Sequence, residues 1–258
     1  MAKTFRKVTI LHELFSGSDM STYRAILFNL DSLTKAKVET DQLKIVLPEL
    51  GQETFPILGK HLTNSQIKLL IQNAVLVYNA CMELSIYQGF QAPTVLNVCE
   101  QAISKALLRT PSPDEIEEVV KAIAAPFHLN FSKKTLLYLN SLYHSGYILG
   151  IVANLPIPLV SITERLKVLG ILRLFESIII SSDCGFHKPG KKIFKIAIES
   201  LECKEQDVVI VGTNLDRDIF PLDGIDSKKI YFNNHRKLSG LPNGVGSIHS
   251  LEELKNIA

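Results

Sequence analysis

The pattern of apolar and polar positions divides the chain into two kinds of segment. Residues 25–30 (AILFNL) form a short apolar run that ends at polar residues, which is typical of a buried strand. From about residue 39 to residue 125, apolar positions instead recur at helical spacing and no convincing strand interrupts them. The pattern predicts helices over 64–85, 94–108 and 116–123, the last after Ser112-Pro113-Asp114-Glu115, which supplies an N-cap, a first-turn proline and a capping-box glutamate.

Beyond residue 126, short apolar strands alternate with amphipathic helices. This alternation is the mark of a doubly wound parallel sheet with helices on both faces. The pattern therefore predicts an α/β core interrupted by an all-helical insert. Strands are expected over 148–153, 177–180, 208–211 and 229–232, and helices over 132–143, 161–169 and 191–201.

Composition and charge narrow the class of protein. The 258 residues are 46% hydrophobic, and 28 Lys and Arg against 26 Asp and Glu give a net charge of +2, which argues against a nucleic-acid partner. The four cysteines are widely spaced without a CxxC pair, so we expect no zinc or disulfide framework and a cytoplasmic location.

Residues 1–20 are expected to be an extension without a signal peptide. The apolar window 147–160 is too short for a membrane span, so no membrane partner is expected.

Ligands of such sheets bind at the carboxyl ends of the strands. The polar and chemically active positions after each predicted strand are therefore the candidates for a site. These positions are Asn29 and Asp31, Ala153 and Asn154, Ser181 to Lys188, and Thr213 to Asp218.

Four runs carry a resemblance to a known family. They are FNLDSLT at 28–34, GIVANLP at 150–156, SSDCGFHKPGKKIF at 181–194 and VVIVGTNLDRD at 208–218. With the helical insert between the first two, the chain resembles the haloacid dehalogenase (HAD) superfamily, in the subfamily with a helical cap after the first core strand. The resemblance implies a Rossmannoid core over 21–36 and 126–258, with a central parallel sheet flanked by helices, and an all-helical cap over 37–125.

The resemblance also implies a site in which the nucleophile position is altered. Phosphatases of this superfamily carry two aspartates, DxD, after the first strand: the first attacks phosphorus and the second is the acid and base. Here Asn29 stands at the nucleophile position and Asp31 at the acid/base position. A neutral amide oxygen is a far poorer nucleophile than a carboxylate, although Asn29 can still hydrogen-bond an anion.

The other three motifs are partly altered. Ala153 replaces the Ser or Thr that binds the phosphoryl group, whereas Asn154 and Lys188 match the family pattern. In the last motif Asp218 is retained but Thr213 replaces an acid. By resemblance the catalytic positions are Asp31, Asn29 and Lys188, the anion-binding positions are Ala153, Asn154, Lys188, Thr213 and Asn214, and the metal positions are Asp31 and Asp218.

The altered charge bears on metal binding. An intact site presents four carboxylates and one lysine, whereas this one presents Asp31 and Asp218 against Lys188 and Arg217. Fewer carboxylates attract Mg²⁺ less strongly. We expect weak or absent Mg²⁺ binding and no cofactor, with Mg²⁺ used only if the protein is active.

Two hypotheses follow. One is a catalytically impaired or inactive member with an anion-receptive cleft and a binding or regulatory role. The other is an active small-molecule hydrolase that uses Asp31, Lys188 and Asp218, either phosphatase-like or similar to the metal-independent dehalogenases. The Thr213-Asn214 pair resembles the dehalogenase pattern, but that reading leaves Asn29 unexplained. The expected partner is a small anionic molecule, and a homodimer is left open.

Overall fold

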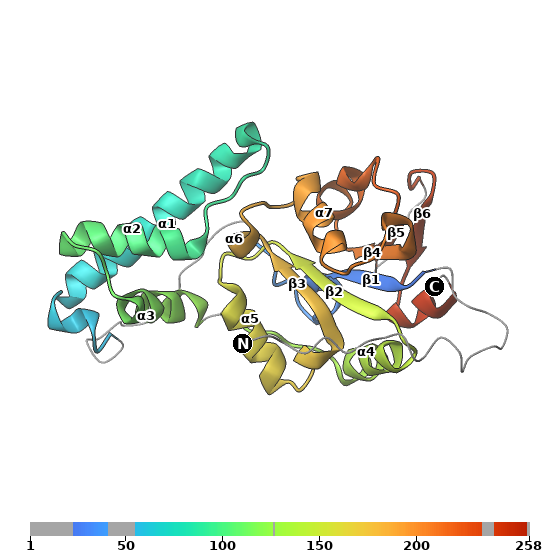
Figure 1. Ribbon diagram of the computed structural model, residues 1–258, viewed down its shortest axis with the longest axis horizontal. Helices are drawn as coiled ribbons and strands as arrows, with labels where there is room; N and C mark the ends of the chain where they lie inside the picture. Colours follow the sequence, from blue (N-terminus) through green and yellow to red (C-terminus); the bar gives the residue numbers. More distant parts are fainter. Residues whose placement is uncertain (1–22, 41–54, 126, 234–239, 257–258) are drawn as a thin grey trace.

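The described part of the chain contains a single parallel sheet. The computed structural model describes residues 23–40, 55–125, 127–233 and 240–256, and within them six strands pair in the order β3-β2-β1-β4-β5-β6 (Figure 1). All pairings are parallel, so the predicted α/β class is confirmed. The strands are β1 (Ala25–Asn29), β2 (Ile148–Ala153), β3 (Phe175–Ile180), β4 (Val208–Gly212), β5 (Lys228–Phe232) and β6 (Val245–Ile248).

Strand β1 lies at the point where the strand order changes direction. Strands β2 and β3 follow on one side of it, and β4, β5 and β6 on the other. Asn29 is in register with Val152 of β2, and Phe28 with Val211 of β4. The carboxyl ends of β1, β2 and β4 therefore meet at a topological switch point, where open α/β sheets form their ligand sites.

Helices cover both faces of the sheet. Along β1, Ile26 and Phe28 belong to the apolar cluster that includes residues of α4 (Lys133–His144) and α5 (Leu159–Val168). Ala25 and Leu27 point the other way, into the cluster formed with α7 (Lys191–Glu199). Because successive side chains of a strand alternate between faces, a strand covered on both sides is continuously apolar.

The inserted helices form a separate group beside the sheet. They are α1 (Asn64–Ser85), α2 (Val95–Leu107) and α3 (Pro113–Ala124), hereafter the cap helices (Figure 1). The side chains of Thr63, Thr94 and Ser112 accept backbone N–H groups at their first turns. Such caps satisfy donors that have no partner inside the helix, and the predicted helix starts are met to within three residues.

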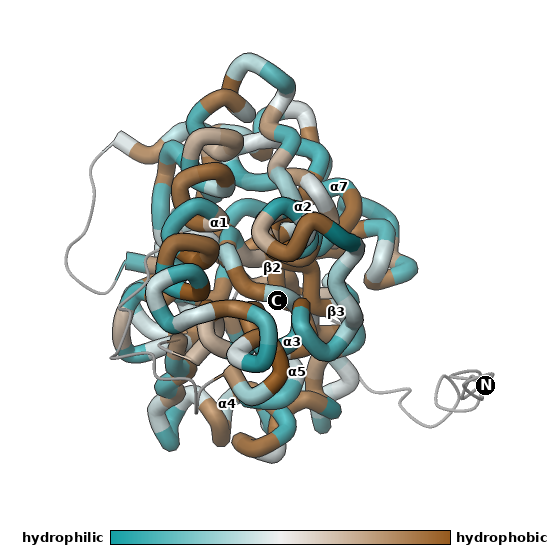
Figure 2. Tube along the Cα trace, turned by 90° about the vertical axis from the view of Figure 1, so that its left-hand side faces the viewer, coloured by the Kyte–Doolittle hydropathy of each residue, from teal (hydrophilic) through white to brown (hydrophobic). Residues whose placement is uncertain are grey.

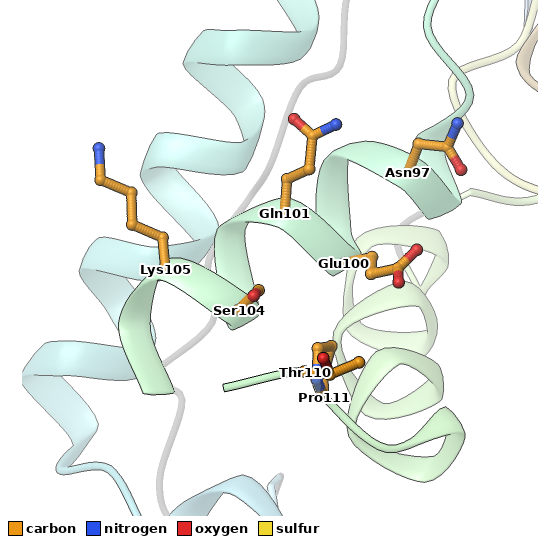
Figure 3. Close-up of a pocket in the computed structure, with 7 residues that line it drawn as sticks. All are labelled: Asn97, Glu100, Gln101, Ser104, Lys105, Thr110 and Pro111. Atoms are coloured by element: carbon orange, nitrogen blue, oxygen red, sulfur yellow. The ribbon is translucent and has the colours of Figure 1, made fainter. Parts of the chain in front are cut away.

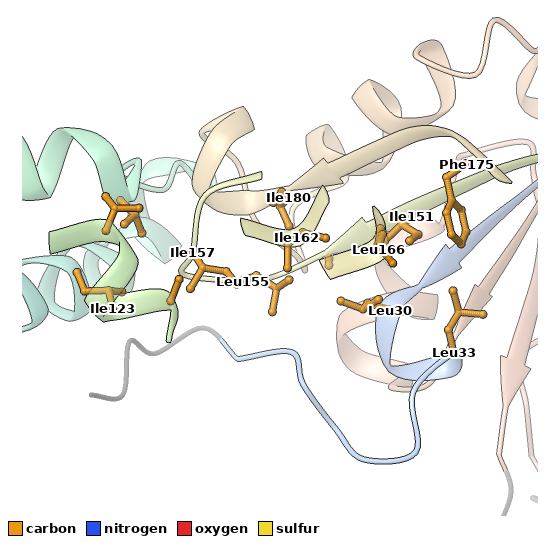
Figure 4. Packing of buried hydrophobic residues seen from close by; sticks show 14 of the residues in the cluster. Leu30, Leu33, Ile123, Ile151, Leu155, Ile157, Ile162, Leu166, Phe175 and Ile180 are labelled. Atoms are coloured by element: carbon orange, nitrogen blue, oxygen red, sulfur yellow. The ribbon is translucent and has the colours of Figure 1, made fainter. Parts of the chain in front are cut away.

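Apolar packing joins the cap helices to the core. Figure 4 shows Ile123 of α3 beside Leu155 and Ile157, which follow β2, and the contacts continue to Leu30 and Leu33 after β1. All of these side chains are buried and belong to one cluster. The carboxyl end of the sheet is thus held against the inserted helices.

Helix α1 has two apolar faces. One face, with Ile67, Ile71 and Tyr78, is buried in the main apolar cluster. On the other face, Leu76 and Leu84 are exposed. Figure 2 views the molecule from the side on which the inserted helices lie. By length and composition alone, Asn64–Gln88 could cross a membrane, but one third of its apolar window is buried inside the protein. The buried face of α1 packs in the same apolar cluster as residues of α2 and α3.

Some elements were misplaced or missed by the sequence pattern. Helix α5 begins at Leu159, directly after Pro158, and not at the predicted 161. Strand β6 was not predicted, because VGSI is short and contains a glycine. A Cβ at Gly246 would lie 2.8 Å from Ile230 Cδ1, so glycine permits the close approach of β6 to β5. The expected extension 1–20 lies outside the described residues.

Candidate anion-binding site

Five charged side chains gather at the carboxyl end of β1. Lys188 and Arg217 are the cations, and Asp31, Glu39 and Asp218 are the carboxylates. Four of them are buried, and the Arg217 side chain is only 19% exposed. Buried charges are costly unless they are paired, so this cluster is an organised site.

The amide of Asn29 is fixed by hydrogen bonds. Its Nδ2 donates to Asp218 Oδ2 at 2.8 Å and to Glu39 Oε2 at 3.1 Å. Its Oδ1 accepts the backbone N–H of Asp31 at 2.8 Å, and Thr213 Oγ1 lies 3.4 Å away. Both amide hydrogens are therefore directed at carboxylates, and the Asn29 side chain is engaged through both of its polar atoms.

Asp31 holds the segment that follows it. It lies in the short helix η1 (Leu30–Ser32), and its Oδ1 accepts the backbone N–H groups of Val38 at 2.6 Å and Glu39 at 3.0 Å. Its Oδ2 has no hydrogen-bond partner among the described residues and lies 3.7 Å from Arg217 Nη2. One oxygen is thus structural, and the other faces a cation.

Lys188 is completely buried between two carboxylates. Its Nζ lies 2.8 Å from both carboxylate oxygens of Glu39 and 2.9 Å from Asp218 Oδ1. The side chain of Asn154 bonds the Lys188 backbone on both sides, accepting its N–H and donating to its carbonyl at 2.9 Å each. Asn154 therefore positions Lys188, while its neighbour Ala153 at the end of β2 is fully buried and presents only a methyl group.

Asp218 is held by the turn after β4. Its Oδ2 accepts the N–H groups of Thr213 at 3.0 Å and Asn214 at 2.9 Å, and Asn214 Oδ1 accepts the N–H of Arg217. Burial alone would raise the pKa of Asp218, but the charges of Lys188 and Arg217 outweigh it and hold that pKa below its ordinary value. Asp218 is therefore an ionised partner of both cations.

Gly212 allows this turn to close. A Cβ at Gly212 would lie 2.5 Å from the Cβ of Asp218, closer than real contacts permit. A residue without a side chain is needed where β4 passes beneath the π-helical turn η7 (Leu215–Ile219).

Glu39 is the site residue that the sequence did not reveal. Its carboxylate is fully buried and contacts Lys188 Nζ, Arg217 Nη2 at 3.0 Å, Asn29 Nδ2 and the backbone N–H of Asn154 at 3.3 Å. Burial raises the pKa of Glu39 to about 7, and the neighbouring Asp218 and Asp31 add to this, while Lys188 and Arg217 oppose it. A glutamate in the charged stretch 35–39 is normally expected to be solvated, so the local sequence carried no signal for its burial.

The arrangement of these oxygens does not suit Mg²⁺. The described residues contain no group of three His, Cys, Asp or Glu side chains arranged to hold a metal ion. Asp218 Oδ2 already accepts three N–H groups, and its Oδ1 pairs with Lys188. The Lys188 ammonium lies between Glu39 and Asp218, so a cation of the protein stands among the carboxylates that would bind a metal.

The loop that carries Lys188 is tied to the cap helices. The backbone N–H of His187 donates to Phe90 O at 3.0 Å, and that of Ala92 donates to Gly185 O at 2.9 Å. The Nε2 of His187 lies 2.5 Å from Ser85 Oγ at the end of α1, and both side chains are buried. The position of the cap helices is therefore coupled to the Lys188 loop.

A separate surface depression lies on the cap. It has a volume of about 590 Å³ and is open and polar (Figure 3). Its lining contains none of the five charged side chains of the site, so it is a distinct feature. The lining residues are Asn97, Glu100, Gln101, Ser104, Lys105, Thr110 and Pro111.

Comparison with known protein families gives one clear match. The sequence model described as haloacid dehalogenase-like hydrolase matches residues 70–220, more than half of the chain. The matched range includes Ala153, Asn154, Lys188 and Asp218, and it begins after Asn29 and Asp31.

Curated relatives are similar over part of their length. The glyceraldehyde 3-phosphate phosphatase of Methanothermobacter thermautotrophicus is 31% identical over 148 residues, 53% of this chain and 60% of that protein. The protein of the same name from Pyrococcus furiosus is 32% identical over 102 residues, 39% of this chain and 40% of that protein. The matches thus span 60% or less of these relatives.

Solved structures share the fold. The 2-haloacid dehalogenase from Pseudomonas syringae superposes with a TM-score of 0.59 at 16% identity, over 91% of this chain and 97% of that one. The magnesium-bound HAD-hydrolase YfnB from Bacillus subtilis gives 0.51 at 20% identity, over 91% and 98%. At such identities the likeness concerns the fold alone.

Proposed function

Because the chain belongs to the haloacid dehalogenase-like hydrolase family, we propose that it is a member with impaired or absent hydrolysis that binds a small anion at the carboxyl end of β1. Its role would then be binding or regulation. The site residues would be Asn29, Asn154, Lys188 and Arg217 as hydrogen-bond donors, hereafter the anion site.

One observation carries the proposal. Asn29 occupies the end of β1 with its Nδ2 donated to two carboxylates and its Oδ1 accepting a backbone N–H. Covalent hydrolysis of phosphate esters or haloacids requires an ionised carboxylate as nucleophile at this place. A neutral amide whose polar atoms are already bonded does not supply one.

The neighbouring substitutions support the same conclusion. Ala153 has no hydroxyl to bind a phosphoryl group, and Thr213 has no charge with which to bind Mg²⁺. In contrast, the donors of the anion site already bind one carboxylate, that of Glu39. The named phosphatase relatives act on an anion, which fits a cleft that has kept its cations.

An active hydrolase is the second candidate. The observation that favours it is Asp31 Oδ2, a buried carboxylate oxygen without a hydrogen-bond partner among the described residues. Such an oxygen is suited to accept a proton from water. In this case Asp31, Lys188 and Asp218 would act together on a phosphomonoester or a haloacid, with Mg²⁺ required for the phosphatase-like chemistry.

A turnover assay tests the proposal. Purified protein is given a panel of phosphomonoesters and 2-haloacids, each with and without Mg²⁺, beside the Asp31→Ala variant. We expect no release of phosphate or halide above the level of Asp31→Ala. Release that depends on Asp31 would overturn the proposal and establish the active hydrolase.

We also propose a cytoplasmic location and a small-molecule partner for the protein. All four cysteines are free thiols, Cys81, Cys99, Cys184 and Cys203, as a reducing cytoplasm would keep them. The partner would be a small anionic molecule and neither a nucleic acid nor a membrane. Light scattering of the purified chain would decide between monomer and homodimer.

A further inference from the structure

The carboxylate of Glu39 fills the anion site. Both of its oxygens lie 2.8 Å from Lys188 Nζ. Its Oε2 also lies 3.0 Å from Arg217 Nη2 and accepts a hydrogen bond from Asn29 Nδ2 at 3.1 Å. Its Oε1 accepts the backbone N–H of Asn154 at 3.3 Å. Asn29 ends β1, Asn154 follows β2, Lys188 lies between β3 and α7, and Arg217 lies in η7 after β4, so the donors come from four separate segments at the carboxyl end of the sheet. Such convergence on one planar group is the arrangement of a ligand site, here occupied by the protein's own side chain.

We propose that Glu39 is an internal ligand that closes the anion site, and that a small external monocarboxylate binds to the same donors once Glu39 withdraws. This inference rests on the proposed anion-binding function and adds the class of ligand and the contact that blocks it.

Charge selects a monocarboxylate over phosphate. Asp31 and Asp218 flank the same two cations, with Asp31 Oδ2 3.7 Å from Arg217 Nη2 and Asp218 Oδ1 2.9 Å from Lys188 Nζ. Exchanging the ionised Glu39 carboxylate for an external carboxylate keeps the charge of the cluster unchanged. A phosphate dianion would add one further negative charge beside two buried carboxylates. Like charges repel more strongly in the protein interior than in water, because the effective dielectric constant is lower there.

Hydrogen bonds from neighbouring loops hold the segment that carries Glu39. Asp31 Oδ1 accepts the N–H groups of Val38 and Glu39, Thr40 N donates to Asn154 O at 3.1 Å, and Lys35 N donates to Asn130 O at 2.8 Å. The side chains of residues 35–37 are exposed, and the segment is not a strand of the sheet. Withdrawal of Glu39 therefore requires loss of local bonds and leaves the sheet pairing intact.

Chemical rescue tests the inference. The thermal midpoint Tm of Glu39→Ala is measured in sodium acetate, in sodium phosphate and in sodium chloride at equal ionic strength, beside wild type and Glu117→Ala, which removes an exposed glutamate. Acetate should raise the Tm of Glu39→Ala by about 3–6 °C once it reaches about ten times its Kd. Wild type, in which Glu39 competes for the same donors, should respond less, Glu117→Ala should match wild type, and adding Lys188→Met to Glu39→Ala should abolish the response.

Several results would overturn the inference: a folded Glu39→Ala that ignores acetate, an equal response of wild type, or a larger response to phosphate than to acetate. If Glu39→Ala folds only with acetate present, that result supports the inference. If it folds under neither condition, the isosteric Glu39→Gln replaces it, and acetate must bind that variant at least about tenfold more tightly than wild type.

The two proposals fail separately. Turnover by wild type would contradict the proposed loss of hydrolysis without bearing on the acetate response. A lack of rescue in an otherwise inert protein would contradict the role of Glu39 alone.

Discussion

Position 29 shows how one atom type limits the chemistry of this site. The amide of Asn29 donates to Asp218 and Glu39, whereas an aspartate there would face both as a like charge. A carboxylate at this position would need a compensating cation such as a metal ion. Of the three positions that differ from the family pattern, Asn29 and Thr213 lower the negative charge of the site, whereas Ala153 lacks a hydroxyl.

Restoring these three positions together should restore affinity for Mg²⁺. The variant Asn29→Asp/Ala153→Ser/Thr213→Asp adds two carboxylates and one hydroxyl around the ends of β1, β2 and β4. We expect Mg²⁺ to raise its Tm and to support phosphomonoester hydrolysis, with a smaller effect in Asn29→Asp alone. If Mg²⁺ leaves both Tm and hydrolysis of the triple variant unchanged, the assignment of these positions is wrong.

Lys188 should contribute strongly to stability because it is the buried partner of two carboxylates. Replacing it in Lys188→Met leaves Glu39 and Asp218 with Arg217 as their remaining cation. Removing one partner of a buried ion pair costs about 3–5 kcal/mol, whereas Lys195→Met at an exposed position of α7 should change stability by less than about 0.5 kcal/mol. Urea unfolding at neutral pH measures the free energy of unfolding of both variants. Equal losses of stability would show that the buried ion pairs of Lys188 do not stabilise the fold.

The residues of the site were only partly predictable. The sequence pattern points to Asn29, Asp31, Lys188 and Asp218 because they follow strands, and the structure brings all four to one end of the sheet. Glu39 could not be selected, because its burial depends on an ion pair with a residue 149 positions away. The positioning role of the Asn154 side chain was likewise hidden, since only the folded chain shows that it bonds the Lys188 backbone.

At the scale of elements, helix starts were predictable because their signals are local. The capping box of α3 is an example: Ser112 Oγ accepts the N–H of Glu115, and the Glu115 carboxylate accepts the N–H of Ser112 at 2.7 Å. Strand β6 lacked such a local signal, since its pairing with β5 brings together residues about 16 positions apart. Local capping is thus visible in the sequence, whereas an edge strand depends on its neighbour.

The same capping box gives a pH dependence. Hydrogen bonds from Arg109 are the main cause of the lowered pKa of Glu115, which is about 2. A lowered pKa in the folded state means that the ionised Glu115 stabilises the fold above pH 4.5, its ordinary value, and that this contribution is lost as the pH falls toward 2. The difference in urea midpoint between wild type and Glu115→Gln should therefore shrink on acidification from about pH 7 to about pH 3.

Glu117→Gln is the matched control for that experiment. Glu117 lies on the same helix but pairs with Lys121 at an exposed position, where an ion pair contributes little. We expect its urea midpoint to stay close to that of wild type at both pH values. A Glu115→Gln difference that stays constant or grows on acidification would contradict the stabilising role of the ionised Glu115.

The junction between the cap helices and the Lys188 loop should loosen when His187 is removed. His187 contacts Ser85 through Nε2, the Lys188 carbonyl through Nδ1, and the Phe90 ring in an edge arrangement at 5.4 Å. In His187→Ala we expect faster hydrogen exchange at the amide of Ala92, which donates to Gly185 O. The exposed His144→Ala should leave that amide unchanged, and equal exchange in both variants would show that His187 does not hold the junction.

At the scale of the whole molecule, the fold was predictable and the activity is not. The alternation of strands and helices fixes a parallel sheet, and the switch of strand order at β1 fixes where a ligand site lies. Related folds carry out different reactions on the same scaffold, so the fold does not decide between hydrolysis and binding. That decision depends on the charge and hydrogen bonds of a few side chains around Asn29.

Covalent capture at residue 29 tests the central claim most directly. Unmodified protein is incubated with labelled phosphomonoesters and labelled 2-haloacids, with and without Mg²⁺, quenched in acid and mapped by peptide mass spectrometry, beside the triple variant. The account predicts no label on Asn29 and no product release, with label on residue 29 only where an aspartate has been restored. Label on the Asn29 side chain of the unaltered protein, together with multiple turnovers, would contradict it.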